Sequence, residues 1–258
     1  MSAPTPRGPL AGAGYFVRGL RLLGHPRLRG VVALPLAINA LLFAAAIAYV
    51  ASDFHAWVDR LVPAWLEWLH WLLWPLFAIA VLLALFYGFT LIANVVGAPF
   101  NAVLAARVEA LLRGDSAQPA AAGSGAALRE ALHGLGSELR KLGYFAVRAV
   151  PLLVLFLIPG VNAAAPFLWL IFSAWMLALE YLDYPMGNHG IGFREQRRRL
   201  RARPGLAFGF GGATLVATLL PGLNFIAMPA AVAGAAVMWV EALAPVPPPQ
   251  EVGRLRPE

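Results

Sequence analysis

The sequence contains no cysteine, and only 13% of its 258 residues are charged. Without cysteine, the chain has no disulfide framework, no thiol nucleophile and no cysteine ligand for a metal ion. Soluble domains have roughly a quarter of their residues charged. The low charged fraction, with 60% hydrophobic residues and a mean hydropathy of +0.70, excludes an ordinary soluble domain. The composition predicts an all-α integral membrane protein.

Recognisable enzyme motifs are missing as well. There is no Gly-x4-Gly-Lys-Ser/Thr phosphate loop and no His-Glu-x2-His zinc motif, and the 5 histidines do not occur at metal-ligand spacing. No serine or aspartate has a neighbouring base in the sequence that would make it a nucleophile. We therefore expect that the protein is not an enzyme, holds no cofactor or metal, and does not hydrolyse ATP.

Acidic residues are fewer than basic ones, 13 against 20, which gives a net charge of +7. The arginines gather between apolar stretches, where the positive-inside rule places them, so we expect no nucleic-acid partner. A basic segment precedes the first apolar stretch and an acidic loop follows it, which predicts a cytoplasmic N-terminus. Met1 to Leu23 lacks the features of a secretory signal. It is interpreted as a cytosolic lead-in with an amphipathic piece from Tyr15 to Leu23.

Two apolar stretches are long enough to cross a bilayer as helices. Residues 31–52 and 71–93 number 22 and 23, and at about 1.5 Å per residue each covers a hydrocarbon core about 30 Å thick. Residues 94–113 then have the pattern of an amphipathic helix, either interfacial or capping the bundle, and 128–142 that of a polar helix after a loop. We expect a single membrane domain over residues 1–243 and a disordered tail over 244–258.

Two further apolar regions are interrupted halfway by the pattern Pro-Gly-apolar-Asn, at residues 159–162 and 221–224. Because Pro and Gly end one helix and Asn caps the next, the pattern predicts helical hairpins over about 144–182 and 206–243. The first arm of each has 15 residues, about 22 Å of helix. Ordinary paired spans and re-entrant hairpins that enter the membrane only partly both fit, and the short first arms favour re-entry.

The two hairpin tips and the start of the first span are candidate anion sites. Helix N-termini carry unpaired N–H groups and a partial positive charge, and broken helices inside membranes aim such ends at anionic solutes. Asn162 and Asn224 are expected at the tips, and Arg27 and Arg29 at the start of the first span. The alternative is structural, because Pro-Gly is a common turn, Asn a common cap, and arginine satisfies the positive-inside rule.

Two polar side chains interrupt apolar stretches. Asn39, within the first span, is expected to face the protein interior, since an amide in lipid costs free energy. Arg148, in the third apolar region, is expected either to snorkel to the interface or to meet Glu180 or Asp183 from the returning arm.

Short stretches between about residue 14 and residue 240 carry a family resemblance. They are Gly14-Tyr15-Phe16 with Gly19, Pro26 to Arg29, Leu34-Pro35-Leu36 with Asn39, Ala93-Asn94, Ala98-Pro99-Phe100-Asn101, Pro159 with Asn162 and Pro166, Ala174-Trp175-Met176, Tyr181, Asp183-Tyr184-Pro185, Asn188, Pro221 with Asn224 and Pro229, and Trp239. In this order they resemble the CysZ family of bacterial sulfate permeases, which is related to the etoposide-induced membrane proteins of eukaryotes.

The resemblance implies a multi-pass permease of the bacterial inner membrane that carries sulfate, with sulfite as an open alternative, for cysteine biosynthesis. It also implies two long spanning helices, two partly inserted hairpins and homo-oligomers. In the family, a Gly-Leu-Arg-Arg stretch helps to bind sulfate; here the corresponding residues are Arg27-Leu28-Arg29-Gly30, so one positive charge is moved. A second departure is Ala106, where relatives often have Glu.

The leading hypothesis is sulfate movement, channel-like or ion-coupled, without ATP. Arginine supplies charge and directed donors along the path, and asparagine supplies neutral donors that release the anion readily. The residues expected to line the path are Arg27, Arg29, Asn39, Asn101, Asn162 and Asn224, with Arg107 near one mouth. The expected partners are the anion, membrane lipid and further copies of the chain. The rival hypothesis is a non-transporting membrane scaffold or regulatory protein.

Overall fold

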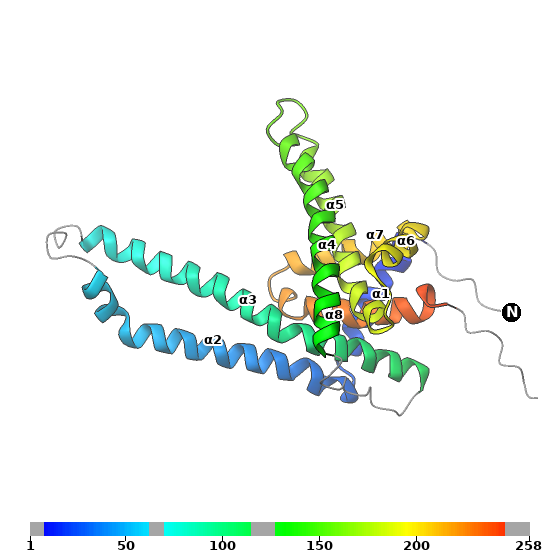
Figure 1. The fold of residues 1–258 in the computed structure, drawn as a ribbon, viewed down its shortest axis with the longest axis horizontal. Coiled ribbons are helices and arrows are strands. Elements are labelled where there is room, and N and C mark those ends of the chain that lie inside the picture. Colours follow the sequence, from blue (N-terminus) through cyan, green and yellow to red (C-terminus); the bar gives the residue numbers. More distant parts are fainter. Residues whose placement is uncertain (1–7, 62–69, 115–126, 246–258) are drawn as a thin grey trace, which may run out of the picture. The chain divides into compact units, whose positions relative to one another are not determined.

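The computed structural model describes residues 8–61, 70–114 and 127–245, and within these ranges it is helical and has no strand (Figure 1). The predicted all-α fold is confirmed for these residues; the predicted loop after residue 114 and the tail after residue 245 lie outside them. The elements are α1 (Pro9–Leu22), α2 (Pro26–Leu61), α3 (His70–Arg113), α4 (Ala127–Leu155), α5 (Ala165–Asn188), α6 (Phe193–Ala202), α7 (Pro204–Leu219), α8 (Asn224–Met238) and the π-helical turn η2 (Trp239–Leu243).

The chain divides into two compact units, of which one comprises His25–Leu104. It contains α2 and most of α3, and each of these helices includes one predicted span. Pro26–Tyr49 is apolar over 24 residues, long enough to cross a membrane, and exposes large side chains such as Leu41 and Ile47. The predicted interfacial segment 94–113 is not a separate helix, because α3 runs from His70 to Arg113 with Pro99 inside it.

The other unit comprises Met1–Gly24 and Ala105–Glu258, and α1 packs there against α7 and α8. The prediction that the first helix begins at Tyr15 is wrong, because it begins at Pro9 and already contacts α7 through Gly12. A Cβ placed on Gly12 would lie 2.8 Å from the backbone nitrogen of Phe210. Small residues of this kind let helix backbones approach closely. The segment is therefore part of the packed core rather than a lead-in to it.

The second arms of the two predicted hairpins are long helices. Ala165–Asn188 has 24 residues and Asn224–Leu243 has 20, and both are apolar enough to cross a membrane. With Pro26–Tyr49 they make three such helices among the described residues. Most of α8 is buried, because alanine and glycine fill the face that α1 covers. The first arm α7, with 16 residues, is shorter, as the sequence predicts.

The two hairpin tips share two backbone features, although residues 156–164 separate α4 from α5 and only residues 220–223 separate α7 from α8. Gly160 and Gly222 both have positive φ, 86° and 85°, which glycine adopts without steric cost. In each tip, the Asn backbone N–H donates to the carbonyl oxygen of the residue before the proline, over 3.0 Å from Asn162 to Ile158 and 3.0 Å from Asn224 to Leu220. The repeated sequence pattern therefore encodes one turn, used twice.

Candidate functional site

The seven residues predicted to line an anion path are divided between the two units. Arg27, Arg29, Asn39 and Asn101 belong to the unit of residues 25–104, and the others, Arg107, Asn162 and Asn224, belong to the second unit. Neither unit alone contains the complete predicted set. Arg27 and Arg29 are exposed at the start of α2, Asn101 is buried on α3, Arg107 is half-buried, and the side chain of Asn39 lies outside the described ones.

The first turn of α2 uses its own backbone donors internally. His25 accepts the N–H of Arg27 at its Nδ1 atom (3.3 Å), and its carbonyl oxygen accepts the N–H groups of Leu28 (3.0 Å) and Arg29 (3.2 Å). Pro26 has no N–H. An anion at this helix start would therefore be bound by the guanidinium groups of Arg27 and Arg29 rather than by backbone N–H groups.

The predicted capping role of the tip asparagines is wrong. Helix α5 begins at Ala165, three residues beyond Asn162, and α8 begins at Asn224 itself. Neither helix has a side-chain cap hydrogen bond, and both asparagine side chains are exposed. The backbone N–H of each Asn instead donates back to the preceding arm, so the turn closes through the main chain.

A polar cluster that the sequence analysis did not anticipate joins α4, α5 and α6. Lys141 donates to Oδ2 of Asp183, and Gln196 donates to Oδ1 of Asp183 (2.6 Å) and to the carbonyl oxygen of Ile191 (2.8 Å). Asp183 was an expected partner of Arg148, but it pairs with Lys141, seven residues earlier on the same face of α4. The guanidinium of Arg148 instead stacks on the ring of Tyr144, 3.6 Å from its centroid.

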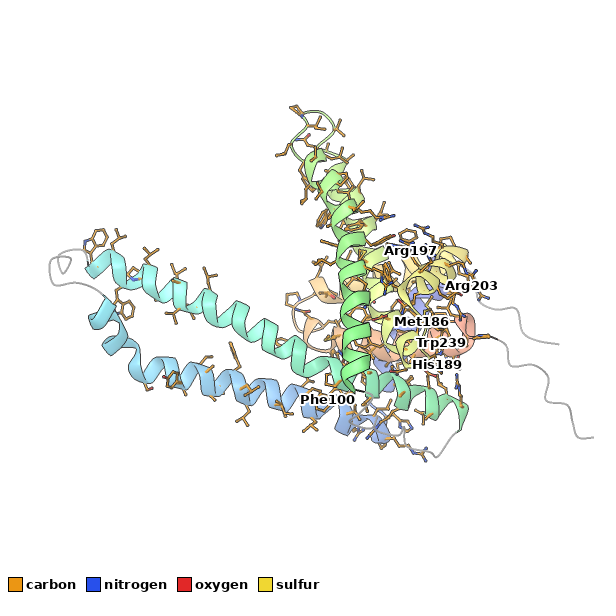
Figure 2. All side chains as sticks on the ribbon, viewed as in Figure 1. Phe100, Met186, His189, Arg197, Arg203 and Trp239 are labelled. Atoms are coloured by element: carbon orange, nitrogen blue, oxygen red, sulfur yellow. The ribbon has the colours of Figure 1, made fainter. Side chains whose placement is uncertain are left out.

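A buried carboxylate lies at the end of α3. Glu109 is 5% exposed, and its Oε2 atom is 2.8 Å from Nε2 of His189 and 3.4 Å from Nη2 of Arg113. The centroids of the His189 and Trp239 rings are 5.3 Å apart, where α5 ends and η2 begins, and Figure 2 labels both residues. The arrangement joins α3, α5 and η2, so we interpret it as structural.

The N-terminal helix is tied to the C-terminal turn by an ion pair. Two guanidinium nitrogens of Arg18 donate to the two carboxylate oxygens of Glu241, each over 2.6 Å. The hydrogen bond to Glu241 raises the pKa of Arg18. Burial raises the pKa of the nearby Tyr15 hydroxyl, and the charge of Glu241 adds to this effect, so the hydroxyl is neutral at physiological pH.

On α6, hydrogen bonds from Arg199 and Arg198 lower the pKa of Glu195.

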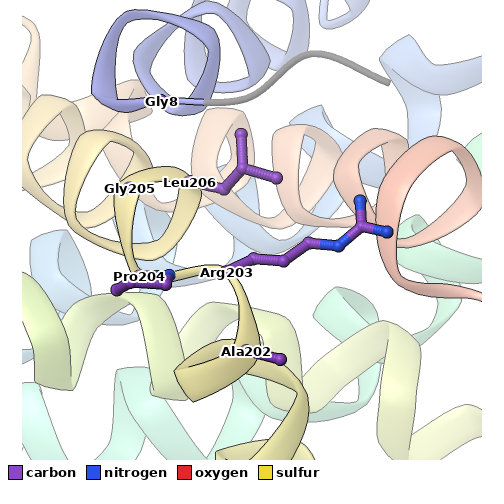
Figure 3. Close-up of a pocket in the computed structure, with 6 residues that line it drawn as sticks. All are labelled: Gly8, Ala202, Arg203, Pro204, Gly205 and Leu206. Atoms are coloured by element: carbon purple, nitrogen blue, oxygen red, sulfur yellow. The ribbon is translucent and has the colours of Figure 1, made fainter. Parts of the chain in front are cut away.

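A cavity of about 350 Å³ lies beside the start of α1, where α6 meets α7. Figure 3 shows its lining residues, with the side chain of Arg203 extending away from the α6–α7 junction. Nη1 of Arg203 is buried and has no hydrogen-bond partner among the described residues. The other lining residues are Gly8, Ala202, Pro204, Gly205 and Leu206, so Arg203 is the single charged residue of a lining that is otherwise small or apolar.

Comparison with known proteins decides the family. A family model described as "Sulfate transporter CysZ/Etoposide-induced protein 2.4" matches residues 15–229. The chain belongs to this family. A relative named "Sulfate transporter CysZ" from Pseudomonas paraeruginosa is 44% identical over 235 residues, which cover 90% of this chain and 95% of the relative. Proteins of the same name from Pseudomonas aeruginosa and Pseudomonas fluorescens are 43% and 44% identical, covering 90% and 93% of this chain.

Membership of the CysZ family and the three long apolar helices make the chain a membrane protein. The match covers both hairpin tips and the start of α2. Of the two positions at which the resemblance implies a departure, Gly30 stands on α2 with no described atom within 4 Å of a Cβ placed there, and Ala106 is half-buried on α3.

Proposed function

We propose that this protein carries sulfate across the bacterial inner membrane, without ATP, and supplies cysteine biosynthesis. The observation that carries the proposal is 44% identity over 90% of the chain to a protein named as a sulfate transporter. The helices also suit a multi-pass membrane protein, with stretches of 24, 24 and 20 residues that are apolar and long. Sulfite is a second substrate of the same chemistry, and the functional protein is a homo-oligomer.

In this proposal, the anion passes Arg27 and Arg29 and then polar groups of the hairpins. Exposed guanidinium groups supply the charge, since the backbone donors of the first α2 turn are bonded internally. The tips enter the membrane only partly, and their exposed asparagine amides supply neutral donors. Asn39 and Asn101 on the long helices, and Arg107 at one mouth, complete the path within a single membrane domain.

Uptake of labelled sulfate into proteoliposomes that contain the purified protein tests the function. We expect saturable uptake that excess sulfite blocks and that excess chloride leaves largely unchanged, because a divalent oxyanion gains more from paired guanidinium donors. Uptake no greater than in protein-free liposomes, from protein that is folded by circular dichroism and elutes as a single species, would reject transport. The rival function, a membrane scaffold or regulatory protein, would then be favoured.

Substituting both tip asparagines separates a path role from a structural one. We expect the variant N162A/N224A to take up sulfate at a rate reduced about tenfold, the effect of about 1.4 kcal/mol lost in binding. The melting temperature should stay nearly unchanged, because neither exposed amide caps a helix and such substitutions change stability by less than about 0.5 kcal/mol. A lower melting temperature with normal uptake would show that the amides serve the fold instead.

A further inference from the structure

A groove of about 610 Å³ lies on the second unit, between α4, α5, the last turn of α6 and the start of α7. The residues that line it are Tyr144, Val147, Arg148, Pro151, Leu152, Leu168, Ile171, Phe172, Trp175, Arg201, Pro204 and Phe208. Two of them are arginines and most of the others are apolar. The path proposed for sulfate does not use any of these residues.

The two ends of the groove differ in chemistry. Along α4, Tyr144 and Arg148 come before Pro151 and Leu152, which approach the first hairpin tip. Helix α5 returns from that tip, so Leu168 lies at the tip end and Trp175 at the other. Arg201, just before α7, adds a second cation at the end away from the tip. The groove is therefore cationic and aromatic at one end and aliphatic toward the tip.

The cationic end is held in place by contacts of its own. The Arg148 guanidinium stacks on the Tyr144 ring at 3.6 Å and donates from Nη1 to the Tyr144 carbonyl oxygen (3.3 Å). The Tyr144 hydroxyl in turn accepts a hydrogen bond from Nε1 of Trp175 (3.0 Å). A stacked guanidinium keeps its outer N–H groups directed along the ring plane, which suits bidentate binding of an oxyanion. Arg201 is exposed and has no ion pair among the described residues.

We propose that this groove binds an anionic phospholipid. Its phosphate contacts Arg148 and Arg201, beside the Tyr144–Trp175 pair, and an acyl chain lies along Val147, Leu152 and Leu168 toward the hairpin tip. Charge complementarity favours an anionic headgroup, and the length of aliphatic lining favours a chain over a free ion. A sulfate or phosphate ion would leave that lining uncovered. Tyrosine and tryptophan at the headgroup end match the preference of these residues for the membrane interface.

Native mass spectrometry of the full-length protein in detergent, titrated with phosphatidylglycerol, tests the proposal, because the adduct mass identifies the ligand. We expect the wild-type protein to hold phosphatidylglycerol and the variant R148Q/R201Q to hold about tenfold less at the same lipid concentration, as charge-assisted hydrogen bonds are lost. Phosphatidylcholine, with the same chains, and inorganic phosphate should bind much less than phosphatidylglycerol.

The matched control is R194Q/R198Q, which removes two charges from α6, the helix that also carries Arg201, but changes no lining residue of the groove. It should keep the wild-type affinity. Equal loss in both double variants would reduce the effect to general surface charge and overturn the proposal. Equal binding of phosphatidylcholine, or a phosphate adduct as abundant as the lipid adduct, would overturn it as well. This test does not measure sulfate uptake. A negative result would therefore overturn the lipid-binding proposal without bearing on the transport function.

Discussion

Replacing Gly19 by alanine is expected to lower the melting temperature of the protein by about 10 °C, the effect of about 3 kcal/mol of overpacking. A Cβ at this position would lie 2.7 Å from Cα of Gly234 and closer still to the carbonyl oxygen of Ala230. Both obstacles are backbone of α8, so no side chain can rotate away to make room. The added methyl group therefore separates α1 from α8, and thermal unfolding in detergent measures the loss.

The matched control is Gly14→Ala in the same helix. A Cβ on Gly14 would meet no described atom within 4 Å, so the substitution adds no clash. We expect it to raise the stability slightly, by about 0.5–1 kcal/mol, because alanine loses less conformational entropy than glycine in a helix. If both variants melted alike, α1 would not be docked on α8 as the structure has it, and the N-terminal helix would not belong to the core.

The role of α1 illustrates what the sequence could not predict. The sequence predicts an amphipathic piece only from Tyr15 to Leu23, and glycines at 12, 14 and 19 weaken a helix on propensity alone. Two of these three glycines are contact points with α7 and α8, whereas Gly14 is not. Which glycine allows close approach depends on partner helices that are about 190 to 220 residues distant in the chain. Local sequence carries no such information.

The hairpins were predictable because their signal is local. Pro-Gly-apolar-Asn fixes a turn within five residues, and both tips adopt it with nearly equal glycine φ values. The function of the asparagine within that turn was not predictable in the same way. Asn is a frequent cap, but its side chain here faces outward, since each helix starts without a side-chain cap. The partner of Asp183 was missed for a similar reason, because Arg148 and Lys141 lie on one face of α4 and only packing selects Lys141.

We expect sulfate uptake to be preserved when the arginine at position 27 is moved by about one helical turn. We expect most of the uptake to be lost when Arg29 is removed. The first variant is R27A/G30R, which places the charges at 29 and 30 as the resemblance to the family implies. Positions 27 and 30 are three residues apart in α2 and share a helix face. A Cβ on Gly30 would meet no described atom within 4 Å, so the substitution begins without a clash among the described residues.

The second variant is R29A, which removes the cation that both arrangements have in common. Loss of one charge-assisted hydrogen bond costs about 1.5–3 kcal/mol, so uptake at low sulfate concentration should fall at least about tenfold. R21A, which removes an exposed cation from the last turn of α1, is the control for net charge and should transport normally. Uptake that follows the number of arginines rather than their positions would mean that the start of α2 attracts anions only through its overall charge. Loss of uptake in R29A with normal uptake in R21A requires a contact made by a specific side chain, because both variants lose one positive charge and differ only in where that charge lies. Preserved uptake in R27A/G30R would show in addition that position 30 can replace position 27.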